Sequence, residues 1–204
     1  MKSFKKIALA VVAAMTMSTL VATSASAAPM SITSVKKAGT TTTLGTAATT
    51  PITLPVPSDN SVDTADTVEF VVTVDTGTVV SVVATNAFVV PAVATSTAPV
   101  TASSGAATWS QNVGTGTTAT FYVYTKTTAI GSVVINNGGT TLTYYVQGQA
   151  GLINNLTVSA PASGAAGTKQ DVLVTATDVF GNKVSGKYIT ATVFAATATL
   201  DAAS

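Results

Sequence analysis

Residues 67–75 have the sequence Thr67-Val68-Glu69-Phe70-Val71-Val72-Thr73-Val74-Asp75. The apolar residues Val68, Phe70, Val72 and Val74 stand two positions apart, and most residues between them are polar. Successive side chains of a β-strand point to opposite faces, so a period of two predicts a strand with one buried face and one face in water. This stretch indicates a sheet that covers a hydrophobic core.

Two hairpins are predicted from the turn residues that follow such strands. Residues 79–85 come after Asp75-Thr76-Gly77-Thr78, and we expect them to run back as the partner of residues 67–75. Residues 132–135 and 140–147 flank Asn136-Asn137-Gly138-Gly139, which has strong turn chemistry.

Residues 117–126 form another alternating segment. Phe121 and Val123 are expected to face inward, and Tyr122 and Tyr124 outward. Threonine makes up about one residue in five, and β-branched residues favour strands over helices. Since no stretch after the first 28 residues has a helical period with caps, the sequence predicts an all-β protein.

The expected architecture is an Ig-like β-sandwich of the antiparallel Greek-key type over residues 28–148, because short strands alternate with turns. Residues 147–151 (Gln-Gly-Gln-Ala-Gly) form the predicted linker to a second unit, residues 149–204, with strands at 171–177 and 188–194. A full sandwich needs roughly 100 residues. We therefore expect the second unit to be a partial Ig-like domain and the chain to be part of a longer protein. The alternative is that this half-unit packs on the first unit.

Residues 1–27 have the pattern of a secretory signal peptide. Lys2, Lys5 and Lys6 precede an uncharged apolar stretch, which ends in the small-residue motif Ala25-Ser26-Ala27. Cleavage there leaves six lysines against eight acids, a net charge of −2. The predicted location is extracellular, at the cell surface, with no membrane span after cleavage. The alternative is that the apolar stretch is retained as an N-terminal membrane anchor.

The composition excludes several classes of function. The chain contains no His, Cys or Arg, and only 8% of its residues are charged. The triads and pairs of hydrolases that use His or Cys, the usual zinc sites and disulfides all need the missing residues. A near-neutral charge also lacks the electrostatic footprint of a nucleic-acid partner. We expect no enzyme activity, no cofactor and no nucleic-acid binding.

One motif in the second unit resembles a known family. Asp178-Val179-Phe180-Gly181-Asn182 follows a predicted strand and precedes Val184-Ser185-Gly186 and the next predicted strand. This pattern resembles the start of bacterial Ig-like domains of the invasin/intimin type, and the resemblance covers residues 152–194. It implies a stacked, non-catalytic module of a surface or adhesion protein.

Two groups of residues are candidate binding sites. Asp59, Asp63 and Asp66 could offer oxygen ligands to calcium, although the alternative is that they are solvated turn residues before the strand at Thr67. Trp109, Tyr122 and Tyr124 could form an aromatic platform for sugar rings, although packing of these rings is the alternative.

The sequence thus predicts a secreted cell-surface structural or adhesive protein built of Ig-like modules. Its partners would be other surface molecules, copies of itself or glycans. The alternative is a carbohydrate-binding module or an accessory domain of a larger secreted enzyme. The two classes differ in whether an exposed aromatic site exists.

Expression of the full chain in a secreting bacterial host tests the signal peptide. We expect the exported protein to start at Ala28 or Pro29, because signal peptidase cleaves after the Ala25-Ser26-Ala27 motif. Intact-mass measurement of the exported protein gives the answer. Retention of residues 1–27 in the exported or membrane-bound protein contradicts the prediction.

Overall fold

The computed structural model describes residues 29–91, 100–101, 105–161 and 168–190, so the predicted signal peptide lies outside the described residues. The regular secondary structure of the described residues is strand, apart from a single short 3-10 helix, η1 (Thr64–Asp66). The all-β prediction is confirmed. No helix among these residues has the length and apolar character to cross a membrane.

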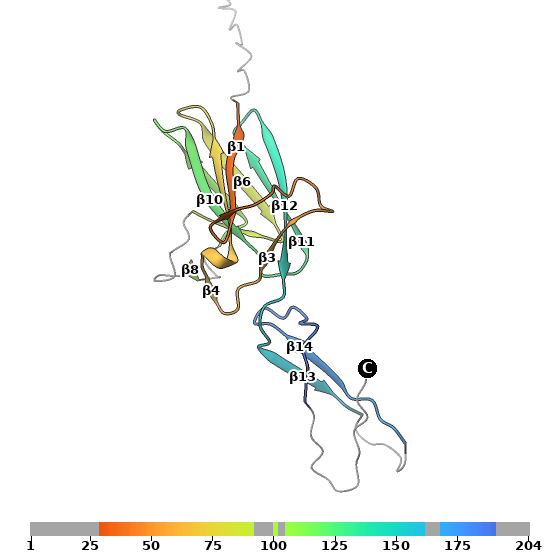
Figure 1. The fold of residues 1–204 in the computed structure, drawn as a ribbon. Coiled ribbons are helices and arrows are strands. Elements are labelled where there is room, and N and C mark those ends of the chain that lie inside the picture. Colours follow the sequence, from red (N-terminus) through yellow and green to blue (C-terminus); the bar gives the residue numbers. More distant parts are fainter. Residues whose placement is uncertain (1–28, 92–99, 102–104, 162–167, 191–204) are drawn as a thin grey trace, which may run out of the picture.

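Two five-stranded sheets pack face to face as a β-sandwich (Figure 1). The first sheet has the order β2 (Thr40–Thr41), β1 (Ser31–Lys37), β5 (Val68–Thr73), β10 (Thr118–Tyr124) and β7 (Phe88–Val90). The second has the order β3 (Ile52–Pro55), β12 (Thr141–Gln149), β11 (Ile130–Asn136), β6 (Val79–Thr85) and β9 (Thr108–Asn112). A short pair, β4 (Ser61–Val62) with β8 (Val100–Thr101), adds to one end of the sandwich.

The core consists of the inward faces of both sheets, as the alternation in residues 67–75 predicts. Phe70 on β5 is fully buried, and its ring stacks on Phe121 of β10 with centroids 5.3 Å apart. The Phe70 ring also meets Tyr144 of β12, in the opposite sheet, at 5.7 Å. These aromatic contacts join neighbouring strands within one sheet and then the two sheets to each other.

The hairpin predicted around Asn136–Gly139 is confirmed. Strands β11 and β12 pair antiparallel, with Ile135 opposite Leu142 and Val133 opposite Tyr144. Gly138 has a φ of +87°, a conformation that a side chain would strain. The Asn136 and Asn137 side chains accept hydrogen bonds from backbone amides of the turn.

The other predicted hairpin is wrong, although both of its strands exist. Strand β5 lies in the first sheet, whereas β6 crosses to the second and pairs with β11 and β9. The connection between β5 and β6 is bonded instead to the turn before β10, where Val74 N–H donates to the Thr117 carbonyl and Gly77 N–H to the Gly114 carbonyl. Because both strands have an apolar face, crossing lets these faces cover each other.

The expectation of a wholly antiparallel sandwich also needs one correction. Strand β3 runs parallel to β12, with Ile52 opposite Val146 and Leu54 opposite Gly148. The chain leaves the first sheet after β2 and joins the edge of the second sheet, beside its longest strand. The inward side chains of β3, Ile52 and Leu54, are buried there.

A two-stranded ribbon of β13 (Asn155–Ser159) and β14 (Leu173–Thr177) extends from the end of β12 (Figure 1). The predicted linker starts too early, because Gln147, Gly148 and Gln149 still belong to β12. Of the strand predicted at 188–194, residues 188–190 are not strand, and residues 191–194 lie outside the described residues.

Truncation of the central ring tests the core. We expect Phe70→Ala to lower the free energy of unfolding by about 3–5 kcal/mol, because it leaves a cavity between two rings and both sheets. Urea unfolding followed by the fluorescence of the single Trp measures the effect. Tyr188→Ala is the control, since Tyr188 is fully exposed and its loss should change stability by less than about 0.5 kcal/mol. Equal stability of the two variants contradicts the core assignment.

Candidate functional site

The three aromatic residues predicted as a sugar platform do not share one surface. Tyr124 is fully buried, and its ring stacks on Phe88 at 5.4 Å. Gly105 packs so closely on the Tyr124 ring that a Cβ there would clash with it. The expectation that Tyr124 faces outward beside Tyr122 is therefore wrong, because the segment at Gly105 covers the end of β10.

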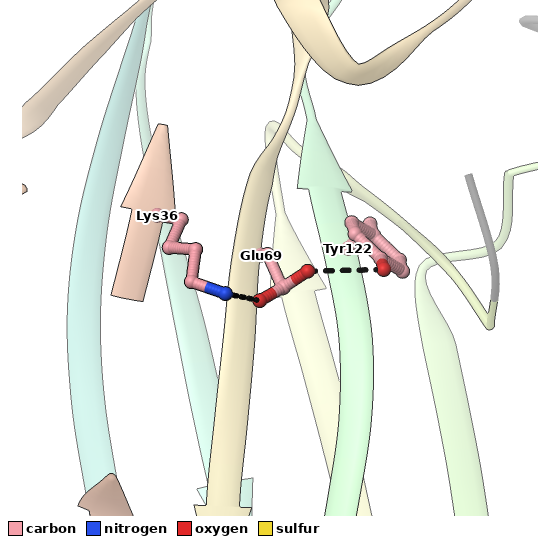
Figure 2. Close-up of polar contacts among 3 residues, drawn as sticks. All are labelled: Lys36, Glu69 and Tyr122. Atoms are coloured by element: carbon pink, nitrogen blue, oxygen red, sulfur yellow. Dashed lines mark hydrogen bonds and ion pairs between the residues drawn. The ribbon is translucent and has the colours of Figure 1, made fainter. Parts of the chain in front are cut away.

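Tyr122 does lie on the outer face of its sheet, in a polar row with Glu69 and Lys36 (Figure 2). The Tyr122 hydroxyl donates to Glu69 at 3.1 Å, and the Lys36 ammonium lies 3.2 Å from the other oxygen of the carboxylate. Burial raises the pKa of Tyr122, and the hydrogen bond with Glu69 and its negative charge raise it further. The row ties three neighbouring strands together across their surface.

Trp109 lies on β9, at the edge of the second sheet. It stands opposite the buried Val82, so its indole points toward the core, and it meets the Phe121 ring at 5.3 Å. The same indole lines a groove of about 380 Å³ at the side of the sandwich. The other lining residues come from the segment after β7, from β9 and from β10: Pro91, Ser110, Gln111, Thr118 and Thr120.

The predicted calcium residues are used by the backbone around η1. Asp59 accepts from the Ser61 amide, and Asp63 caps the helix by accepting from the Ala65 amide at 2.7 Å. Asp66 returns a hydrogen bond by accepting from the Asp63 amide. Within the described ranges, no three acidic, His or Cys side chains are grouped so that they could hold a metal ion. The geometry is that of a capped turn leading into β5.

Another group of residues connects the ribbon to the sandwich. We name it the joint, and it consists of the loop Asp178–Asn182 with Lys126, Thr128 and Gly151. Asp178 is buried, and its carboxylate accepts from the backbone amides of Gly151, Phe180 and Asn182 at 2.9–3.1 Å. Burial disfavours the charged carboxylate, but the hydrogen bonds outweigh it and hold the pKa of Asp178 below its usual value. The loop is therefore organised around one ionised side chain.

Asn182 carries the contact from this loop to the sandwich. Its Nδ2 donates to the Lys126 carbonyl at 2.8 Å and to the Asp178 carboxylate, and its Oδ1 accepts from the Thr128 amide. The Lys126 ammonium lies 4.4 Å from the centre of the Phe88 ring and 5.9 Å from that of Phe180. Polar and aromatic contacts thus hold the two parts of the chain together.

The sequence pointed to the Asp178–Asn182 motif and to Trp109, but not to their partners. The 126–128 loop is far from Asp178–Asn182 in the chain. The residues that line the groove with Trp109 are neutral and of common types, so no motif marks them. The available signal for the joint was the turn motif at Asp178, since an acid in such a turn can cap backbone amides of the loop.

The acid pair Asp63 and Asp66 at η1 predicts how the stability of the protein depends on pH. Burial raises the pKa of Asp66 to about 6, and the charges of Asp63 and Asp59 add to the rise. The folded state thus holds this proton more firmly than the unfolded chain, so stability falls as pH rises from about 4 to about 6. We expect Asp66→Asn, which keeps the acceptor for Asp63, to raise the urea midpoint at pH 7 and to flatten this part of the pH profile. Asp75→Asn, in an exposed turn, is the matched control, and an unchanged profile in Asp66→Asn contradicts the assignment.

Comparison with protein-family models, with curated proteins and with solved structures finds no match for this chain.

Proposed function

We propose that this chain is a non-catalytic structural or adhesive protein, secreted to the cell surface, in which a β-sandwich is followed in rigid succession by a further module. The joint is the observation that carries this proposal. A flexible tether would need no buried, fully bonded carboxylate between the two parts. Here Asp178 organises a loop, and Asn182 of this loop forms hydrogen bonds with the 126–128 loop of the sandwich.

A fixed joint suits a protein that projects or forms a surface layer. In such a protein each module must transmit force to the next and hold it at a distance from the surface. A joint with several hydrogen bonds resists bending better than a free linker. One of these bonds is made by Gly151, which follows the end of β12, and the ribbon extends from that end of the sandwich (Figure 1). Each module then adds its length in a defined direction.

Sequence features support the same proposal. The first 27 residues have the signal-peptide pattern, and the absence of His, Cys and Arg fits a scaffold better than an enzyme. The resemblance to bacterial Ig-like domains of the invasin/intimin type is part of the proposal for residues 152–194. It is supported by the Asp178 loop, where the carboxylate caps backbone amides and Gly181 has a φ of +85°.

A second candidate function is carbohydrate binding, as a binding module or an accessory domain of a larger secreted enzyme. The observation that favours it is the groove beside Trp109, which combines an aromatic ring with hydroxyl and amide side chains. This function and the structural one are compatible, because the groove and the joint share no residues.

Weakening of the joint tests the structural proposal. In the parent chain we expect backbone amides of β14 and β11 to report the same rotational correlation time by ¹⁵N relaxation. We expect Asn182→Ala to shorten the correlation time of β14 alone, because it removes the bonds to Lys126 and Thr128. The thermal midpoint of the sandwich should stay unchanged.

Lys187→Ala is the matched control, since Lys187 is exposed and lies outside the loop. A ribbon that already tumbles independently in the parent chain overturns the proposal of a rigid joint. So does an Asn182→Ala chain whose two parts still tumble as one body.

A further inference from the structure

The groove beside Trp109 exists because one strand is short. Strand β7 pairs with β10 only from Tyr122 to Tyr124. Beyond β7, the described residues leave Thr118 and Thr120 of β10 beside the edge strand β9 of the other sheet. Residues of both sheets therefore line the groove, together with Pro91, which directly follows the end of β7.

The lining has a distinctive chemistry. Trp109 is the one aromatic residue of the lining, and its ring is partly covered where it packs on Phe121. Ser110, Gln111, Thr118 and Thr120 supply hydroxyl and amide groups, which both donate and accept hydrogen bonds. None of the six lining residues is charged.

We infer that this groove binds a neutral glycan, with a sugar ring against Trp109 and its hydroxyls on the flanking threonines and Gln111. The inference rests on the second candidate function and names its ligand class. Sugar hydroxyls donate and accept like the lining groups, and the C–H face of a pyranose ring suits the negative face of an indole.

Other ligand classes fit the groove less well. A phosphate, sulfate or carboxylate would need a cationic partner, and the lining has none. A purely apolar ligand would leave the amide of Gln111 and three hydroxyls without hydrogen bonds, which costs free energy. The volume of about 380 Å³ lies within the range of roughly 300–1,000 Å³ found for small-molecule sites. One or two sugar units are of this size.

Trp109 itself provides the test, because it is the only Trp in the chain. In the folded protein its fluorescence therefore comes from a residue that lines this groove. We expect titration with neutral oligosaccharides built from glucose, mannose, galactose or N-acetylglucosamine to shift the emission to shorter wavelength. The bound sugar should also protect the indole from acrylamide quenching, with a Kd on the order of 1 mM for one shallow site. Sialylated and sulfated oligosaccharides should give no such shift.

Variants separate binding from folding. Trp109→Ala removes a contact with Phe121 and can lower stability, so Gln111→Ala and Thr120→Val carry the test. Both keep the fluorophore, and each should weaken binding at least about fivefold, since a hydrogen bond to the ligand is lost. Tyr188→Ala, which removes a fully exposed aromatic ring that does not line the groove, should bind like the parent. Thermal unfolding confirms that each variant is folded.

Two results overturn the inference: no neutral oligosaccharide alters Trp109 emission up to about 20 mM, or binding survives unchanged in both Gln111→Ala and Thr120→Val. Co-sedimentation of the protein with cell walls of the organism that produces it is then compared with its co-sedimentation with cellulose and with mannan. The comparison shows whether the bound glycan belongs to that cell or to another surface. The relaxation experiment on the joint is independent of this outcome, because no joint residue lines the groove.

Discussion

Burial of apolar side chains between two sheets is the constraint on which the whole structure depends. A chain without cysteine cannot be cross-linked by disulfides, so association of the sheets depends mainly on burial of their apolar faces. The Phe70 ring lies at the centre of this packing, because it contacts Phe121 in its own sheet and Tyr144 in the other. Every feature proposed to have a function is placed by these two sheets: the groove at their edge and the joint at their end.

The joint shows how a single charge can organise a connection between modules. A buried carboxylate is costly unless donors surround it, and Asp178 has backbone donors from its own loop and from Gly151. Asn182 then extends this bonded loop to the sandwich through the Lys126 carbonyl. The chain thereby has a defined junction, which requires burial of one polar cluster. A flexible linker would bury no such cluster.

The aromatic residues illustrate how strand ends change the role of a side chain. In a regular strand, Tyr122 and Tyr124 would share the outer face. Tyr122 keeps that position and binds Glu69, whereas Tyr124 is covered near Gly105 and becomes part of the packing. Trp109, on an edge strand, lies between these cases, since it packs on Phe121 and also lines the groove. Edge positions allow one ring to serve both the core and the surface.

The sequence by itself determined the strand content, the inward residues of β5 and the hairpin of β11 with β12. Each of these follows from neighbouring residues, through a period of two or the chemistry of a turn. Only the tertiary structure decided that β6 crosses to the other sheet, that β3 runs parallel to β12, and that Asn182 meets Lys126. These pairings join segments far apart in the chain, and many alternatives satisfy the same alternating pattern. Which alternative forms is decided when all the inward faces are buried together, a condition that no local stretch of sequence contains.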